Sequence, residues 1–116
     1  MNLSLRSYQY SISVIKFLNN LPNERNYWVV SDQLLKSATS IGANIAEAKS
    51  ASSRKDFIKF YEIALKSANE TKYWLGLLKD ALKISQVEIT PLLQEAEELS
   101  KILAASLLTM KGRRQF

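Results

Sequence analysis

Short hydrogen-bonding side chains recur along one predicted helix, and they are the first residues whose types and spacing could do chemistry. They follow each other at steps of three and four residues, which places them on one helix face beside an apolar stripe. This polar spine is Gln33, Ser37, Ser40, Asn44 and Glu47. Gly42, Ala43 and Ala46 lie among them, so a neighbouring helix can approach closely and buried polar groups must find partners. The pattern predicts a polar spine sealed between tightly packed helices.

Two interpretations of the polar spine differ in the role of Glu47. Ser67 and Glu70 lie on one flank of a later helical segment, where they are placed to be hydrogen-bond partners of the spine. The catalytic alternative is a carboxylate site built from Glu47 and Glu70. Di-metal helical bundles complete such sites with Glu-x-x-His pairs, and this chain contains no histidine. The sequence therefore favours interhelical hydrogen bonding, with no catalytic residue, no metal site and no cofactor.

Basic residues form a second group, whose chemistry would be phosphate binding. Several lie on one line of a helical segment, opposite its apolar stripe, and the others lie on the preceding helix, at the turn between them and in the tail. They are Lys36, Lys49, Arg54, Lys55, Lys59, Lys66, Lys111, Arg113 and Arg114. Such a face can neutralise nucleic-acid phosphates and release counterions, and the alternative is an ordinary solvated surface. Lysine offers no bidentate readout of base edges, so any binding would be to backbone and shape.

Four aromatic residues lie near these bases in the sequence. Stacking on single-stranded bases is one use of aromatic side chains beside cations, and core or subunit contacts are the alternative. The four are Tyr27, Trp28, Tyr73 and Trp74.

Composition excludes several classes of protein. The chain has 116 residues, a formal charge of +5 and no cysteine, so disulfides and thiolate chemistry are excluded. The missing histidine removes the commonest general base, and no glycine-rich phosphate loop is present. No apolar run approaches the roughly 20 residues of a spanning helix, and the N-terminal segment does not read as a signal peptide. We expect one cytoplasmic domain over residues 1–116, without a membrane partner.

Four amphipathic segments must position these residues, over about 3–19, 31–49, 54–82 and 91–111. The first has a helical apolar stripe of Leu5, Tyr8, Ile12 and Ile15, and the second has Leu34, Ala38, Ile41, Ile45 and Ala48. The third has Phe57, Tyr61, Ala64, Ala68, Leu75, Leu78 and Leu82, and the fourth has Leu92, Ala96, Leu99, Leu103, Leu107 and Met110. Short loops between long amphipathic segments predict an all-α, antiparallel up-down four-helix bundle.

Local signals set the ends of these segments. Ser53 with Asp56 three residues later resembles a capping box, and Ser31 is a candidate N-cap. Either Ser85 or Thr90-Pro91 could start the fourth helix, and we prefer Pro91 because proline disfavours helical geometry in the residue before it. The apolar arc of the third segment is wider than one core needs, which suggests a subunit contact.

A motif in two parts covers the polar spine and the segment after it. Its first part is Gln33-Leu34, Ser37-Ala38, Ser40-Ile41 and Ala43-Asn44-Ile45-Ala46-Glu47. Its second part is Phe57-Ile58-Lys59-Phe60, Ile63-Ala64, Ser67 and Glu70. Over about residues 8–110 the chain resembles the four-helix-bundle proteins encoded in intervening sequences of bacterial large-subunit ribosomal RNA genes. The accessory protein of diversity-generating retroelements is similar.

The resemblance implies an antiparallel bundle that assembles into a ring of five subunits and has no enzymatic activity. It implies structural roles for Asn44, Glu47 and Glu70. For the retroelement relative it implies binding to RNA and to a reverse transcriptase. Two hypotheses stay open: an oligomeric, non-catalytic module that binds RNA or DNA through its lysines, and a protein-interaction scaffold without a nucleic-acid role.

Overall fold

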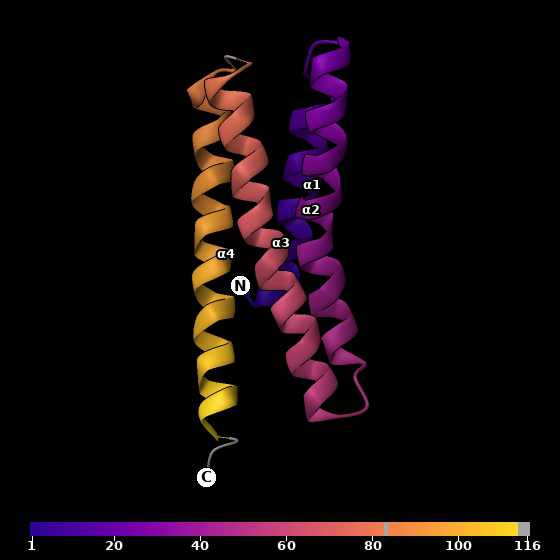
Figure 1. The fold of residues 1–116 in the computed structure, drawn as a ribbon, viewed down its shortest axis with the longest axis vertical. Coiled ribbons are helices and arrows are strands. Elements are labelled where there is room, and N and C mark those ends of the chain that lie inside the picture. Colours follow the sequence, from indigo (N-terminus) through magenta and orange to yellow (C-terminus); the bar gives the residue numbers. More distant parts are fainter. Residues whose placement is uncertain (83, 114–116) are drawn as a thin grey trace.

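The chain folds into four helices within the part that the computed structural model describes, residues 1–82 and 84–113. They are α1 (Leu3–Leu18), α2 (Arg25–Lys49), α3 (Arg54–Asp80) and α4 (Gln86–Arg113). Consecutive helices run up and down beside each other (Figure 1), in a molecule of 51 × 24 × 21 Å. The predicted all-α, antiparallel up-down four-helix bundle is confirmed.

The core lies along the bundle axis and consists mainly of the predicted stripes of α2, α3 and α4. All five stripe residues of α2 are buried, as are four of the seven in α3 and five of the six in α4. The side chains that are fully buried include Leu34, Ile41, Leu75, Leu99 and Leu103. Residues at steps of three and four therefore bury one face of each long helix.

The apolar stripe predicted for the first segment faces away from the core. The buried residues of α1 are Ser7, Tyr10, Val14 and Phe17, whereas Leu5, Tyr8, Ile12 and Ile15 are exposed. Both lines have helical spacing, so the pattern alone does not choose between them. Ser7 decides the orientation, because it packs against Gly42 of α2, where an added Cβ would lie 3.3 Å from the serine Oγ. A larger residue at either position would hold the two helices apart.

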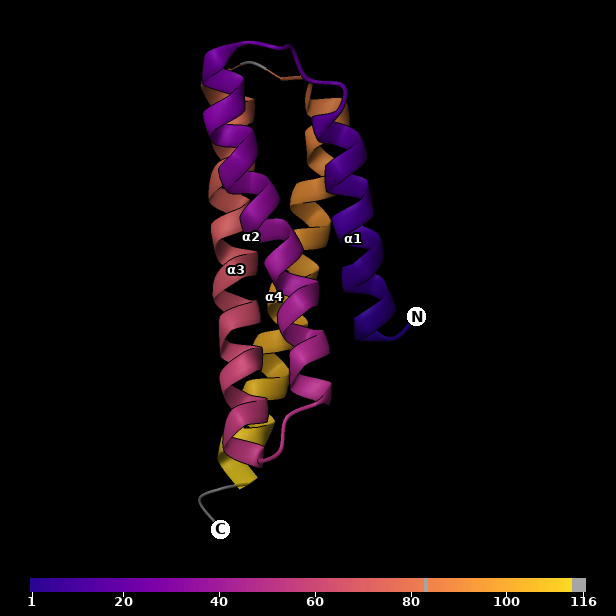
Figure 2. The same cartoon turned by 90° about the vertical axis from the view of Figure 1, so that its right-hand side faces the viewer.

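Helix α1 is shorter than the others and covers one half of the bundle. It has 16 residues, or about 24 Å at 1.5 Å per residue, against 25 to 28 residues in the other helices. The N-terminus consequently lies part-way along the long axis in Figure 2. Beyond it, α2, α3 and α4 continue toward the α2–α3 turn and the end of α4 without α1 beside them.

Two predicted helix starts are wrong. Helix α2 begins at Arg25 rather than at residue 31, because Val30 packs against the core and the Tyr27 hydroxyl donates to the Leu82 carbonyl at 3.1 Å. Helix α4 begins at Gln86 rather than at Pro91, and Ser85 accepts a hydrogen bond from the Val87 amide at 3.3 Å.

Burial explains why α4 continues through Pro91. Ile89 lies before the proline and is fully buried, so the first turn contributes to the core. Proline removes the hydrogen bond to the carbonyl four residues earlier, which belongs to the exposed residue Val87. Water can satisfy that carbonyl, so tertiary burial outweighs the local preference.

Candidate functional site

The polar spine does join α2 to α3, through hydroxyl groups. The Ser67 hydroxyl donates to Ser40 Oγ at 2.9 Å, and Thr71 Oγ1 lies 3.0 Å from Ser37 Oγ. Ser37, Ser67 and Thr71 are buried. Two of these hydroxyls also bond within their own helix, since Ser37 donates to the Leu34 carbonyl at 3.2 Å and Thr71 to the Ser67 carbonyl at 2.8 Å. The sequence prediction missed Thr71, although it lies one helical turn after Ser67 on the same face.

The carboxylates of the predicted spine lie outside this contact. Glu47 and Glu70 are both exposed, and Glu70 accepts a hydrogen bond from the Trp74 indole at 3.1 Å. The prediction that Glu47 is sealed between helices of the chain is therefore wrong. At about 100° per residue, the ten residues from Ser37 to Glu47 rotate the side-chain direction by about 80° away from the α3 contact. A line that starts in the interface thus ends on the surface.

Asn44 occupies an intermediate position at the edge of the contact. Its amide donates to the Ser40 carbonyl at 2.8 Å and to Ser40 Oγ at 2.9 Å, so it supports the serine that reaches α3. Within the described residues, no three acidic side chains gather where they could hold a metal ion. The arrangement can fix helix positions, and it brings no pair of carboxylates to one substrate.

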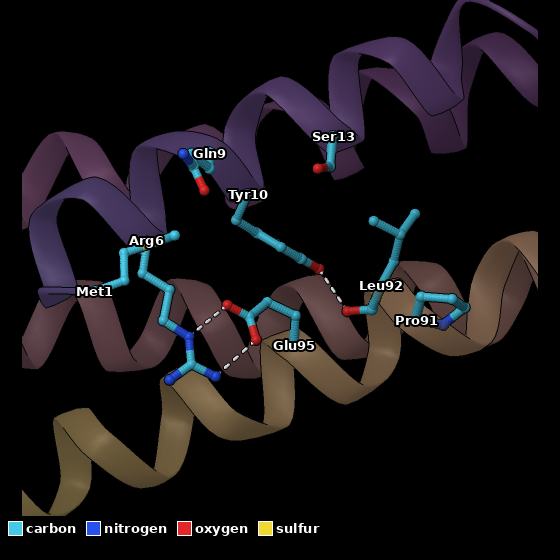
Figure 3. A pocket seen from close by; sticks show the side chains of 8 residues that line it. All are labelled: Met1, Arg6, Gln9, Tyr10, Ser13, Pro91, Leu92 and Glu95. Carbon is cyan, nitrogen blue, oxygen red and sulfur yellow. Dashed lines mark hydrogen bonds and ion pairs between the residues drawn. The ribbon is translucent and has the colours of Figure 1, made fainter.

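A groove of about 440 Å³ between α1 and α4 holds the bonds that fix α1 in place (Figure 3). Arg6 forms a bidentate ion pair with Glu95, with Nε–Oε2 at 2.7 Å and Nη2–Oε1 at 2.8 Å. The hydrogen bond to Glu95 raises the pKa of Arg6. The Tyr10 hydroxyl donates to the Leu92 carbonyl at 2.8 Å, and burial raises the pKa of Tyr10. Each group already has its partner, so this groove anchors α1 to α4.

The sequence prediction did not single out Arg6, Tyr10 or Glu95. Arg6 and Glu95 are 89 positions apart, so no local spacing links them. They became partners only because α1 and α4 are the first and last helices of a closed bundle. The one feature of the sequence that could have predicted the pair is that α1 and α4 carry opposite charges at positions that lie side by side in an antiparallel bundle.

The predicted phosphate-binding residues fall into three groups. Arg54 donates to the Met110 carbonyl at 2.8 Å, and Lys111 pairs with Glu62 at 2.7 Å. Five lysines are exposed and form no ion pair with any residue that the structure describes: Lys36, Lys49, Lys55, Lys59 and Lys66. The side chain of Arg113 and the whole of Arg114 lie outside the described residues.

The bases concentrate at one end of the bundle, which holds the α2–α3 turn and the end of α4 (Figure 1). We call residues 40–67 and 100–113 the basic end. These ranges contain eight bases and three acids, while the rest of the chain contains eight of each. The formal charge of +5 therefore lies entirely at the basic end. The sequence prediction placed the bases on two helical segments, at the turn between them and in the tail, and it did not reveal this grouping along the axis.

Helix dipoles explain some of these cations and leave others unexplained. Lys49 and Lys111 lie in the last turns of α2 and α4, where a positive charge is favourable. Lys55 instead lies in the first turn of α3, where the positive end of the dipole disfavours a cation. Lys59 lies in the second turn, beyond that end. The helix dipole therefore accounts for neither charge.

The four predicted aromatic residues do not lie beside the lysines of the basic end. Tyr27 and Trp28 are near the start of α2, and Trp28 donates to Asn23 Oδ1 at 2.6 Å. Tyr73 and Trp74 are in the second half of α3 and pack edge to face with centroids 5.0 Å apart. All four lie toward the end of the bundle opposite the basic end, so they form no stacking platform beside Lys55 and Lys59.

Comparison with known proteins assigns this chain to a family. A model of the family described as 23S rRNA-intervening sequence protein matches residues 2–105. The chain belongs to this 23S rRNA-intervening sequence protein family. No functionally curated protein matches the chain.

A solved structure with the same fold belongs to a protein of unknown function from the S23 ribosomal protein family of Bacteroides thetaiotaomicron. It is 39% identical to this chain, covers 91% of this chain and 98% of its own, and superposes with a TM-score of 0.85. The family resemblance read from the polar spine is thus confirmed. Within the part of the chain that the structure describes, no helix of this family member is long and apolar enough to cross a membrane.

Proposed function

We propose that this 23S rRNA-intervening sequence family member is a non-catalytic, self-associating module whose basic end binds RNA or other nucleic acid by backbone electrostatics. The observation that carries the proposal is the collection of the entire net charge at one end of the bundle. The name of the family associates its members with the intervening sequences of 23S rRNA.

The outer face of α3 provides the phosphate contacts in this proposal. Lys55, Lys59 and Lys66 point away from the apolar stripe of α3, and all three are exposed. They span eleven positions, or about 16 Å along the helix, which is long enough to meet several successive phosphates of one strand. Lysine heads on flexible stems follow a charged backbone and give little base specificity.

Absence of catalysis is part of the proposal. The exposed carboxylates Glu47 and Glu70 do not converge, and Tyr10 and Arg6 are held by structural partners. Incubation of the purified protein with RNA, in the presence and absence of Mg²⁺, should leave the RNA intact and support this reading. Cleavage that Glu47→Gln or Glu70→Gln abolishes would contradict it.

The binding proposal is tested by a filter-binding titration of structured RNA at several salt concentrations. A variant with Lys55→Glu, Lys59→Glu and Lys66→Glu should bind the RNA at least tenfold more weakly. The slope of log K against the log of the salt concentration should also be shallower by about two to three, because the phosphate contacts of these lysines are lost. The control carries Lys16→Glu, Arg25→Glu and Lys79→Glu, which make the same charge change toward the opposite end. Equal losses in both variants would show that only net charge matters, and binding unaffected by the α3 changes would remove the proposal.

A protein-interaction scaffold without a nucleic-acid role is the second candidate, and the exposed apolar residues of α1 favour it. Its partner would be another protein, as the reverse transcriptase is for the retroelement relative. Pull-down with and without nuclease separates the two functions. A protein partner that survives nuclease treatment, together with an RNA affinity that ignores salt, would favour the scaffold.

A further inference from the structure

A second groove lies between α3 and α4, largely within the basic end, and has a volume of about 600 Å³. The two helices diverge toward this end (Figure 1). Long side chains bridge them there, since Arg54 donates to the Met110 carbonyl and Lys111 pairs with Glu62. Where two helices diverge, the faces that they turn toward each other are only partly covered. The groove therefore leaves apolar surface open to a third element.

Apolar side chains line this groove on both helices. Leu65 contributes from α3, and Ala104, Leu107 and Leu108 contribute from α4. Leu108 is 75% exposed, although Leu107 beside it belongs to the core. A surface helix normally carries polar residues next to its core stripe. The wide apolar arc that the sequence predicted for the third segment reaches the groove at Leu65, so a contact at this groove would account for part of that arc.

Both walls of the groove have the spacing of a helix face. The α3 wall is Glu62, Leu65, Lys66 and Asn69, and the α4 wall is Ala104, Leu107, Leu108 and Lys111. Each wall runs over positions i, i+3, i+4 and i+7, or about 10 Å along the helix axis. The side-chain ridge of a third helix packs into a groove of this kind. An extended segment would gain no backbone hydrogen bonds there, because α3 and α4 use their amides and carbonyls within each helix.

The rim of the groove favours an occupant that carries negative charge. Lys66 is exposed and forms no ion pair with any described residue. Among the described residues that line the groove, Glu62 is the one acid, and Lys111 already neutralises it at 2.7 Å. None of these lining residues is aromatic, so the bases of RNA have nothing to stack on and would leave the leucines uncovered.

We propose that this groove docks an amphipathic helix of a partner protein, with apolar residues on one side and acidic residues on the flanks. The apolar side covers Leu65 and Leu108, and an acidic flank pairs with Lys66. Charge and shape are then both complementary. The site goes beyond the proposed function, since it depends neither on RNA binding nor on self-association. Lys66 belongs to both surfaces, so RNA and the docked helix compete for one lysine.

Fluorescence anisotropy of a labelled peptide tests the docking. The peptide has about 18 residues, enough to form a helix, with leucines at i, i+3, i+4 and i+7 and glutamates on both flanks. Two control peptides replace its leucines by glutamine or its glutamates by lysine. The full wild-type chain should bind the acidic amphipathic peptide at least tenfold more tightly than either control. Equal affinities for the three peptides, or no binding at about 200 μM protein, would overturn the proposal.

Variants of the chain locate the bound peptide. Leu108→Gln should weaken binding at least fivefold, because a leucine contact is lost. Val87→Gln, at an 84% exposed site near the other end of α4, should not change it. Lys66→Glu should reduce the preference for glutamate over lysine in the peptide at least fivefold, and Lys79→Glu, the same charge change toward the opposite end of α3, should preserve it. Circular dichroism checks that each variant stays helical. Equal effects in a variant and its control would overturn the site.

Particle mass and RNA affinity distinguish a partner protein from the other occupants. Leu108→Gln should keep the particle mass and the RNA affinity of the wild type, because this leucine is assigned to a different partner. A smaller particle would make the groove a contact between copies, and weaker RNA binding would make it part of the RNA site; either result would overturn the proposal. A wild type that binds the peptide at the groove and fails to bind RNA would overturn the proposed function alone.

Discussion

The Tyr10 hydroxyl is a single proton donor that joins α1 to α4. It is buried and bonded to the Leu92 carbonyl, and burial raises the pKa of its phenol. An unfolded tyrosine ionises near pH 10. The stabilisation from Tyr10 is therefore complete below about pH 10 and is lost as the pH rises toward the raised pKa of the folded state.

We expect Tyr10→Phe to lower the free energy of unfolding by about 1 kcal/mol at pH 7. Between about pH 9 and 11 the wild type should lose stability faster than the variant, because only the wild type must keep this phenol neutral. Urea unfolding at a series of pH values measures both effects. Tyr8→Phe, at an exposed position of the same helix, is the control and should follow the wild type. Parallel pH curves for wild type and Tyr10→Phe would contradict the prediction.

Residues close in sequence were predictable, and residues joined by the fold were not. Ser53 accepts a hydrogen bond from the Asp56 amide at 3.1 Å, as the capping pattern predicted. The hydroxyl contacts of Ser37 and Ser40 were predicted in kind, although Thr71 was missed. Arg6 and Glu95 meet across the whole chain, and no spacing rule reaches that far.

At the scale of the helix, Pro91 marks a place where α4 is weaker than its length suggests. The proline lies inside the helix and removes one backbone hydrogen bond. We expect Pro91→Ala to stabilise the protein by about 1 kcal/mol, less than the roughly 3 kcal/mol of a central helix position, because the site is in the second turn. Amide exchange of residues 86–90 should slow in this variant.

The exposed residue Gln94 offers a matched control on the same helix. Gln94→Ala also places alanine on the solvent side of α4, without restoring a hydrogen bond, and should change stability by no more than a few tenths of a kcal/mol. Unchanged or faster exchange in Pro91→Ala would mean that the rigid ring contributes more by restricting the unfolded chain than it costs in the helix.

The four helices were predictable because their apolar stripes repeat over several turns, while their ends and one orientation were not. Residues 25–30 and 86–90 have weak or contrary local signals, and tertiary burial of Val30 and Ile89 decides them. Helix α1 has two lines of apolar spacing, and the line with the larger side chains faces outward. The small Ser7 faces Gly42 instead, since close packing of two helices favours small residues over hydrophobic ones.

For the whole molecule, the basic end predicts where RNA should protect lysines from chemical modification. Acetylation of the protein with and without bound RNA, read by mass spectrometry, should show protection at Lys55, Lys59 and Lys66. Lys16 and Lys79, toward the other end, are internal controls and should react equally in both samples. Uniform protection along the chain would indicate loose coating of the protein by RNA, and no protection at α3 would contradict binding there.

The short α1 leaves the basic end as the part of the bundle that extends beyond it, and this has a consequence for how copies would assemble. Copies that pack side by side with their long axes parallel would bring their basic ends together. At 0.1 M salt, repulsion between basic ends more than about 10 Å apart is largely screened. A polyanion that contacts several neighbouring basic ends would gain avidity from several weak contacts at once. Copies packed antiparallel would place their basic ends at opposite ends of the assembly. The relative orientation of the copies would therefore decide whether one nucleic-acid strand can contact every subunit.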